Sequence, residues 1–466
     1  MSQNSRKLVV VGHGAAGLSA ALAAAEQSRN RGLPLDITVL EKSREDEAGG
    51  NTRWSPSNMR LDSPERIDPG FAEDMLGVCG GQGDPDYFRT LADNATTTIG
   101  WLQGHGVEFV TPVYYLSAGP ARIQPVGGGG AIVAKLLEAA KRAGVKFAYD
   151  SPVSRLVMAA GGRISGVEAR CRDGVTLRDA DAVILACGGF QGNPAMMRAH
   201  FGPDAEIIKL ISPGTRFDTG DGIRIATQHG AVVSGDWNGM HIEPVDPRSR
   251  NSAAVVLVYP YGIVVDADGR RFFDEGGGLM HETWEALARE IHFAKPRRIA
   301  YAILDSRLFD INGFERAIRS EVPPYRAETL EGLAAQIRIP AVNLQQTVEA
   351  FNAAAAGDPG RFDASRCDGL ATDQLKPRKS NWARAITRPP FLAYPLVGAI
   401  AYTFGGLATN AKAEVLGGQG PMPGLYAAGE TTGHFYRTAP NAVAVLRALV
   451  FGKIAGREAV DFLHKR

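Results

Sequence analysis

The chain has 466 residues, of which 44% are apolar and 22% are charged, so it is a globular protein too long for one simple core. Its 51 basic and 50 acidic residues give a formal net charge of +1, and charge therefore gives no reason to expect nucleic acid or an anionic membrane as a partner. The four cysteines (Cys79, Cys171, Cys187 and Cys367) form no CxxC pair, which disfavours zinc, iron–sulfur and c-type haem sites and fits a reducing compartment.

The start of the chain and its apolar runs indicate where the protein works. The first ten residues lack the architecture of a signal peptide, and no apolar run reaches the length of a membrane span. We therefore expect a cytoplasmic protein with no integral membrane segment. From the cysteine spacing we also expect no metal site.

A dinucleotide-binding fingerprint lies close to the N-terminus. Residues 9–11 are an apolar run expected to form a buried parallel strand, and a helix is expected over 18–26. Between them, Gly12 would make the tight turn, Gly14 would let the backbone approach a pyrophosphate, and Gly17 would let the helix pack on the strand. The helix start would present free N–H groups and a positive dipole end to the phosphates.

The expected second strand, residues 37–41, ends on an acid. Glu41 stands where a carboxylate can accept hydrogen bonds from ribose hydroxyls, and with Lys42 behind it favours FAD or NAD over a nucleotide with a 2′-phosphate. A second such unit is absent from the sequence, since residues 127–130 precede a helix but follow no convincing strand. One dinucleotide is therefore expected to have a dedicated site.

Further elements are expected along the first half of the chain. They are a polar loop at 49–55, helices at 86–104 and 131–143, strands and turns over 146–182, a buried strand at 182–190 and a helix at 223–230. Asp221 lies near the start of the last helix, where its carboxylate can cap the helix or bond a ligand.

From about residue 238 the pattern changes. Two strands are expected over 251–275 and helices over 281–291 and 328–357, whereas the glycine-rich loops and a long helix over 441–463 return to the earlier style. We therefore expect an inserted domain at 238–381, between two parts of a first domain at 1–237 and 382–466.

Five motifs follow one another in an order known from one flavoprotein family. They are the fingerprint and residues 49–52, 186–189, 219–222 and 425–430. Over nearly the whole chain these motifs resemble the FAD-binding flavoproteins of the fumarate reductase/succinate dehydrogenase type. Residues 50–53, 379–382, 403–406 and 445–452 are most similar to the soluble branch of tricarballylate dehydrogenases.

The resemblance implies an α/β fold, with a discontinuous Rossmann-type FAD-binding domain built from both chain ends and an inserted α+β capping domain. It implies hydride transfer between flavin N5 and a Cα–Cβ bond activated by a carboxylate or carbonyl. A helix beginning near Asn441 would aim its amides at the flavin pyrimidine ring and stabilise the negative charge that reduction places at N1 and O2. Glu430 is suited to a ribityl hydroxyl. Because residues 49–59 contain no histidine, we expect the FAD to be non-covalent.

The residues expected to contact FAD come from the fingerprint, the family motifs and the last helix. They are Gly12, Gly14, Ala15, Ala16, Gly17, Glu41, Lys42, Gly50, Asn51, Thr52, Arg53, Ala186, Gly188, Asp221, Gly429, Glu430, Asn441, Ala442, Val445 and Leu446. For Arg53 two roles stay open, since its spacing fits both neutralisation of the phosphates and an approach to the substrate.

Four residues outside the cofactor motifs are the first candidates for the chemistry. Arg437 matches the position of an arginine that binds the substrate carboxylate in fumarate reductases, and a guanidinium can do so with two parallel hydrogen bonds. Tyr402 falls where those enzymes carry a substrate-binding histidine, and its phenol can donate a hydrogen bond or transfer a proton without a positive charge. His241 is either a site residue or a structural histidine, and Tyr436 is a weaker candidate next to Arg437.

One position departs from the family pattern. The resemblance places an arginine four or five residues after Glu275, which delivers the proton in fumarate reductases, but Leu279 and Met280 stand there. His281 follows and could substitute, because an imidazole titrates in the useful range, and Tyr402 or water are the alternatives. Without the arginine we expect a less cationic pocket, suited to a less carboxylated or partly apolar substrate.

Three hypotheses about function follow. The first is an FAD-dependent oxidoreductase that acts on the CH–CH group of a small organic acid or ketone, similar to tricarballylate dehydrogenase or fumarate reductase. The second is a cyclic-ketone or 3-ketosteroid-type dehydrogenase that uses Tyr402 or Tyr436 for proton transfer. The third is an FAD-binding subunit that needs a partner chain. With one dinucleotide site, electrons would pass to or from a separate acceptor or donor.

Overall fold

A six-stranded sheet carries the dinucleotide fingerprint. In the computed structural model, which describes residues 5–112, 119–171, 174–355, 357 and 359–466, its strand order is β18–β19–β9–β1–β2–β5. The strands are β1 (Arg6–Val11), β2 (Leu35–Leu40), β5 (Lys146–Ala148), β9 (Ala182–Leu185), β18 (Glu414–Gly417) and β19 (Gly420–Ala427). β1 pairs in parallel with β2 and β9, and β18 is an antiparallel edge strand. Because the sheet is covered on both faces, the inner strands are nearly continuous apolar runs.

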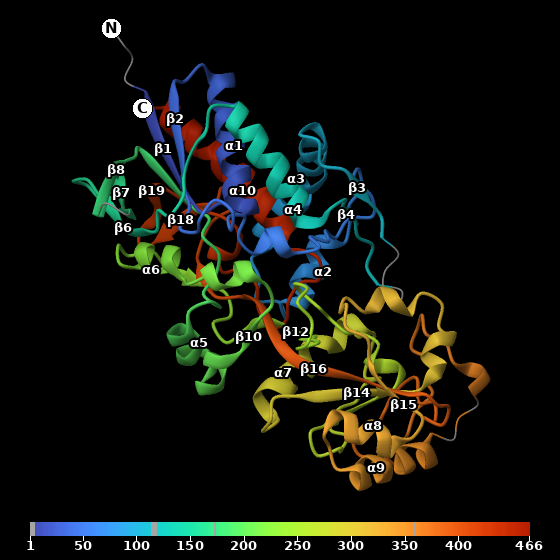
Figure 1. Cartoon of the computed structure of the whole chain (residues 1–466). Coiled ribbons are helices and arrows are strands. Elements are labelled where there is room, and N and C mark those ends of the chain that lie inside the picture. Colours follow the sequence, from blue (N-terminus) through green and yellow to red (C-terminus); the bar gives the residue numbers. More distant parts are fainter. Residues whose placement is uncertain (1–4, 113–118, 172–173, 356, 358) are drawn as a thin grey trace.

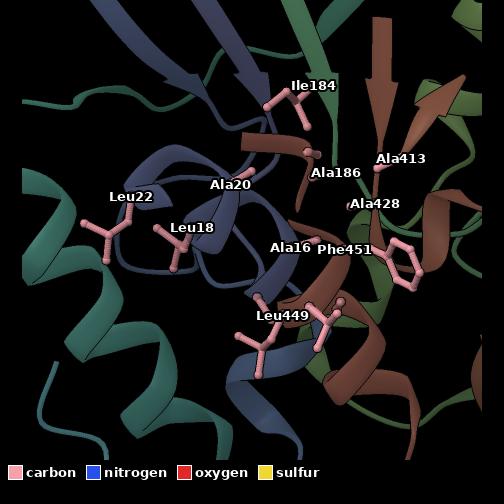
Figure 2. Close-up of a cluster of buried hydrophobic side chains, with 14 of the residues drawn as sticks. Ala16, Leu18, Ala20, Leu22, Ile184, Ala186, Ala413, Ala428, Leu449 and Phe451 are labelled. Carbon is pink, nitrogen blue, oxygen red and sulfur yellow. The ribbon is translucent and has the colours of Figure 1, made fainter. Parts of the chain in front are cut away.

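Two helices from opposite ends of the chain pack against each other beside this sheet, α1 (Ala15–Arg31) and α10 (Ala444–His464) (Figure 1). Their contact is very close: a Cβ on Gly452 would lie 2.2 Å from Ser19 Oγ, and one on Gly456 would lie 2.2 Å from the carbonyl oxygen of Ala20. Figure 2 shows the cluster of small and apolar side chains between these helices and the sheet. The expectation of one FAD-binding domain built from both chain ends is confirmed.

Further elements surround this sheet. They are α2 (Phe71–Val78), α3 (Pro85–Gly104), α4 (Gly128–Arg142), α5 (Pro194–Phe201), α6 (Asp221–Thr227), the short strands β3 (Phe109–Val110), β4 (Gln124–Pro125), β11 (Val233–Ser234) and β17 (Gly406–Leu407), and an antiparallel sheet of β6 (Val153–Met158), β7 (Ile164–Cys171) and β8 (Gly174–Asp179). The sequence determines the start of α3 locally, because the Asp84 side chain accepts a hydrogen bond from the N–H of Asp86 and Pro85 occupies the first turn.

A second sheet is organised around one long strand, β16 (Phe391–Thr403). It pairs with β10 (Lys209–Leu210), β12 (Met240–Val245), β14 (Ala300–Leu304) and β15 (Tyr325–Ala327), and β14 pairs with β13 (Ile263–Asp266). The helices α7 (Met280–Ala294), α8 (Leu330–Ile337) and α9 (Ala341–Ala354) pack in this part of the molecule. Figure 1 shows β16 running from these elements toward the FAD-binding part. Nothing in this arrangement tests the boundaries at 237/238 and 381/382, which stay predictions.

Some expected elements differ from the structure. The helix expected over 328–357 is two helices, because Arg338 takes a left-handed conformation with φ 58° and Pro340 precedes α9. The region 251–275 contains the strand β13 and a turn at residues 267–269, where two strands were expected. The segment 146–148, expected as part of a run of strands and turns over 146–182, pairs in parallel with β2 and so belongs to the main sheet. α10 begins at Ala444, three residues after the expected start.

Within the described ranges, no helix is both long and apolar enough to cross a membrane. In the same ranges, no group of three or more histidine, cysteine or acidic side chains is placed to hold a metal ion.

Candidate active site

A cavity of about 740 Å³ is lined by residues from both ends of the chain and from the second sheet. It begins at the C-terminal edge of β1 and β2, where ligands bind in open parallel sheets. It continues past the start of α10 to β12, α7 and the end of β16. One cavity therefore contains both the fingerprint and most of the expected catalytic residues.

The three fingerprint glycines have different roles. Gly12 has φ 110°, and a Cβ there would lie 2.2 Å from the Ala186 carbonyl oxygen, whereas a Cβ on Gly17 would lie 2.0 Å from the Gly12 carbonyl oxygen. A Cβ on Gly14 would meet nothing closer than Thr52 Oγ1 at 3.7 Å, and Gly14 lines the cavity. Gly12 and Gly17 are thus required by packing, while the space at Gly14 is available to a ligand.

Glu41 and Lys42 lie at the end of β2, at the cavity wall. The buried Glu41 carboxylate accepts hydrogen bonds from the backbone N–H of His13 (2.9 Å) and of Ser43 (2.7 Å), and these hold it in place. Lys42 Nζ donates to Thr219 Oγ1 (2.6 Å) and to Asp221 Oδ2 (3.0 Å). Burial raises the pKa of Asp221, but the charge and hydrogen bond of Lys42 outweigh it, so the pKa is lowered overall. Asp221 is the first residue of α6 and does not cap it.

A second acidic cluster lies deeper in the cavity, at the end of β19. Gln191 Nε2 donates to Asp218 Oδ2 (2.9 Å) and to Glu430 Oε2 (3.2 Å), and the N–H of Thr403 donates to Glu430 Oε1 (3.0 Å). Burial raises the pKa of Glu430 to about 7 and holds the pKa of Asp218 well above its ordinary value. Sequence reasoning identified Glu430 and missed Asp218, although Asp218 directly precedes the motif at 219–222.

Most of the expected FAD contacts line the cavity. They are Gly12, Gly14, Ala15, Ala16, Glu41, Lys42, Gly50, Asn51, Thr52, Ala186, Gly188, Asp221, Gly429, Glu430, Asn441, Ala442 and Val445. Gly17, Arg53 and Leu446 are not among the lining residues. Arg53 Nη1 donates to the carbonyl oxygens of Asp46 (2.7 Å) and Ala48 (3.1 Å), and Leu446 is a core residue.

Tyr402 and His241 are brought together by strand pairing. They stand opposite each other on β16 and β12, with ring centroids 4.9 Å apart. His241 Nδ1 lies 2.9 Å from Glu285 Oε2, and Nε2 lies 3.0 Å from Glu243 Oε1. Burial lowers the pKa of His241, but the two carboxylates outweigh it and raise the pKa to about 10. Both ring nitrogens are therefore engaged by protein carboxylates. Burial raises the pKa of Tyr402, so its phenol is neutral around pH 7.

The other three candidates occupy different environments. Arg437 lines the cavity but is exposed, with φ 62°, and its backbone N–H lies 3.4 Å from Asp236 Oδ2. His281 also lines the cavity, and burial, with the charges of Arg122 and Arg60, lowers its pKa. Tyr436 lies outside the lining, and its hydroxyl accepts a hydrogen bond from the Gly235 N–H (3.0 Å).

Positive charge in the cavity comes from segments other than the loop at 279–280, where the family arginine is missing. Leu279 precedes α7, Met280 is buried at its first position, and neither lines the cavity. Arg60 and the buried Arg122 do line it, and Arg122 Nη2 donates to Asn441 Oδ1 (3.3 Å). The expectation of a less cationic pocket did not include these two residues, which carry no recognisable motif.

A further arginine, Arg447, lies in the wall at the start of α10. It is 1% exposed, and its guanidinium lies over the ring of Phe435 at 3.9 Å. Nη1 is 3.4 Å from the Thr432 carbonyl oxygen, and within the described part of the chain Nε and Nη2 have no hydrogen-bond partner. Sequence reasoning did not select this residue, because an arginine inside an apolar helix pattern carries no signal of its own.

The lining fits a flavin dinucleotide. The open space at Gly14 suits a pyrophosphate, the oriented Glu41 suits a ribose, and the acidic cluster around Glu430 suits the hydroxyls of a ribityl chain. The first N–H groups of α10 have no partner within the helix, and the residues before it line the cavity. The site therefore offers groups that complement the pyrophosphate, a ribose and the ribityl chain of FAD.

Comparison with known proteins identifies the family. A family model described as an FAD binding domain matches residues 7–442. The cytochrome fumarate reductase of Shewanella frigidimarina is 27% identical over 98% of this chain and 77% of its own length. The 4-oxocyclohexanecarboxylate 2-dehydrogenase of Sinomonas cyclohexanicum is 31% identical over 71% of this chain and 61% of its own length.

A solved structure agrees with this assignment. The open conformation of a flavocytochrome c3 fumarate reductase matches with a TM-score of 0.76 and 26% identity, covering 99% of this chain and 79% of the other. The chain belongs to the FAD binding domain family and is an FAD-dependent oxidoreductase of the fumarate reductase/succinate dehydrogenase flavoprotein superfamily, acting on CH–CH groups.

Proposed function

We propose that this chain transfers a hydride between bound FAD and a Cα–Cβ bond of a small organic acid or ketone, activated by a carboxylate or carbonyl. The main support is the continuity of one cavity from the fingerprint and Glu41 to Tyr402, His241 and Arg437. Bound FAD supplies a two-electron carrier that accepts or gives up a hydride at N5. Every other task belongs to the chain's own side chains.

FAD is held non-covalently in this proposal. Backbone around Gly14 binds the pyrophosphate, Glu41 binds the adenosine ribose, and Glu430 binds the ribityl chain. No histidine is present in residues 49–59 to form a covalent link. Denaturation with acid should therefore release all the flavin into the supernatant, and flavin retained on the precipitated chain would contradict this part of the proposal.

Guanidinium groups orient the substrate. Arg437 and Arg122 both line the cavity, and either can bind a carboxylate through two parallel hydrogen bonds. Arg437 is exposed and free to close on an incoming acid, whereas Arg122 is buried and bonded to Asn441. Because both guanidinium groups line the same cavity, they would hold the carboxylate of an acid and polarise it, which activates the neighbouring Cα–Cβ bond.

Two uncharged groups are suited to the proton. In dehydrogenation the hydride leaves one carbon and a proton leaves its neighbour; in reduction both are added. His281 has a lowered pKa and is neutral around pH 7, so it can accept a proton. Tyr402 keeps its phenolic proton and can donate a hydrogen bond to a carbonyl or carboxylate oxygen. His241, engaged by Glu243 and Glu285, is assigned to positioning Tyr402.

A second candidate function is dehydrogenation of a cyclic ketone with Tyr402 as the proton-handling group. It is favoured by the negative charge around Tyr402, since Glu243 and Glu285 flank His241 and both line the cavity. A second carboxylate at this end would be repelled, whereas a carbonyl can accept the phenolic hydrogen bond. The relative named as a 4-oxocyclohexanecarboxylate dehydrogenase agrees with a substrate that carries one carboxylate and one ketone.

The electron partner is proposed to be a separate acceptor or donor, since the sequence has one dinucleotide fingerprint. A location in the cytoplasm and membership of the tricarballylate branch stay predictions.

An anaerobic screen tests the proposal. The oxidised holoenzyme is mixed with saturated small acids, cyclic ketones and acids that carry a ketone, and loss of flavin absorbance is recorded; chemically reduced enzyme is mixed with the corresponding unsaturated compounds. We expect bleaching or recovery with at least one compound class. Response only to cyclic ketones selects the second candidate. If no compound changes the absorbance until a partner protein is added, the chain is an FAD-binding subunit and the proposal fails.

A further inference from the structure

Arg447 is a buried cation that forms no ion pair within the described residues. Its Nε and Nη2 have no hydrogen-bond partner in the described residues, and its contact with the Thr432 carbonyl is long at 3.4 Å. Two neighbouring side chains are uncharged at pH 7, because burial and the charge of Arg447 lower the pKa of His434 to about 3 and burial raises the pKa of the Tyr87 phenol. The charge of Arg447 also lowers the pKa of Glu430, but burial outweighs this effect and raises that pKa to about 7. The Phe435 ring below it offers a weak cation–π contact.

Such an arrangement is unfavourable unless a ligand completes it. A buried charge without a paired group is strongly unfavourable, so buried unpaired guanidinium nitrogens indicate a partner from outside the chain. Arg447 lines the cavity, and side chains on a helix lean toward its N-terminus, here toward the lining residues Asn441 to Ala444. The N-terminus of α10 is itself a centre of positive potential. Two positive centres therefore face the same part of the cavity.

We propose that Arg447 is a fixed positive charge that, together with the α10 N-terminus, stabilises the negative charge of the pyrimidine edge of reduced FAD and so raises its reduction potential. This rests on the proposed function in one respect, that FAD occupies the cavity with its ring near α10. Arg437 and Arg122 line the cavity too, but the first is exposed and the second is already bonded to Asn441. Arg447 differs because it is buried and its Nε and Nη2 have no hydrogen-bond partner among the residues that the structure describes.

The test compares holoenzyme with Arg447→Met, Arg447→Gln and Arg447→Lys variants and needs no substrate. Sulfite affinity is titrated, since sulfite binding bleaches oxidised flavin and leaves negative charge on the same ring edge, and the midpoint potential is measured against redox dyes. We expect the Met and Gln variants to bind sulfite at least tenfold more weakly. A tenfold loss in the two-electron equilibrium constant lowers the potential by about 30 mV. The Lys variant should keep most of both properties.

Lys453→Met is the matched control. Lys453 is also a buried cation on α10, but it lies outside the cavity lining, with Nζ 3.4 Å from the Thr97 carbonyl oxygen. This variant should leave sulfite affinity and potential unchanged. If it shifts them as much as Arg447→Met does, the effect comes from the helix and the proposal is overturned.

Two other results would overturn the proposal. Unchanged sulfite affinity and potential in both neutral variants would show that Arg447 does not act on the flavin. The same unchanged values with weaker binding of carboxylic acids would assign Arg447 to the substrate. If the Met variant does not retain FAD, the sulfite affinity and potential of the Gln variant, which keeps a polar side chain, test the proposal. A shifted potential in an enzyme that responds to no acid or ketone would uphold this inference while the proposed function fails.

Discussion

The two ends of the cavity are built in different ways. At the fingerprint end the wall is largely backbone, and its charged groups are already paired within the protein, as in Glu41 with two N–H groups and Lys42 with Asp221. At the other end the wall consists of side chains from β12, α7, β16 and the loop before α10. Of the cations there, Arg437 is exposed, and two nitrogens of Arg447 have no hydrogen-bond partner within the described residues. In the proposed function, rigid and locally encoded geometry would recognise the cofactor, whereas side chains from distant segments would recognise the substrate.

The largest effects are expected for substitutions of the fingerprint glycines, where Gly12 is required for packing and Gly14 for ligand binding. Gly12→Ala places a Cβ 2.2 Å from the Ala186 carbonyl oxygen at φ 110°, and should destabilise the protein by more than about 3 kcal/mol. Gly14→Ala places its Cβ 3.7 Å from Thr52 Oγ1, so the apoprotein should keep its stability within about 1 kcal/mol. Its FAD affinity should still fall at least about tenfold, which is about 1.4 kcal/mol.

Denaturant unfolding of the apoprotein and titration with FAD measure these two effects. Gly32→Ala is a control for the cost of a positive φ alone, because Gly32 has φ 61° and nothing lies within 4 Å of an added Cβ. Equal destabilisation by Gly12→Ala and Gly32→Ala would refute the packing role of Gly12. A Gly14→Ala protein with unchanged FAD affinity would place the phosphates elsewhere.

At the substrate end, Arg437→Ala should lower kcat/KM for a carboxylate substrate by a factor on the order of 100, because a bidentate charge-assisted contact and its orienting effect are lost. Steady-state kinetics with the compound found in the screen provide the measurement. Arg89→Ala is the control, since Arg89 is an exposed arginine on α3 paired with Asp86. If kcat/KM is unchanged in Arg437→Ala but falls in Arg122→Ala, the buried Arg122 and not Arg437 binds the substrate carboxylate.

The last prediction concerns His241 and has a defined pH dependence. Its pKa is raised from 6.5 to about 10 in the folded protein, so the charged imidazole contributes stability that is complete below pH 6.5 and is lost as pH rises through about 10. His241→Gln should therefore cost about 2 kcal/mol at pH 6, and this cost should shrink toward pH 10. Unfolding of both proteins at pH 6, 8 and 10 gives the slope, and a cost that grows with pH would contradict the assignment.

The residues at the fingerprint end of the cavity could be predicted from the sequence because they form local motifs. Gly12, Gly14, Gly17 and Glu41 lie within 30 positions of one another, and each answers a requirement of the backbone or of a ribose. Tyr402 and Arg437 were predicted only from the family resemblance. Arg122, Asp218 and Arg447 were not predicted, because no spacing marks a residue whose importance depends on which cavity its side chain faces.

The sequence by itself determined the fold class and the cofactor. Apolar strands, positional glycines and a terminal acid are short-range patterns, and a parallel sheet with a dinucleotide at its edge follows from them. The family resemblance carried by the later motifs narrowed this dinucleotide to FAD. Only the tertiary structure decided the pairing of His241 with Tyr402 and the engagement of His241 by Glu243 and Glu285. Likewise, it alone revealed that Arg447 is buried with two nitrogens that have no hydrogen-bond partner in the described part of the chain. The physical reason is that the charge state and role of a side chain depend on its neighbours in space, and these come from segments that the chain brings together only on folding.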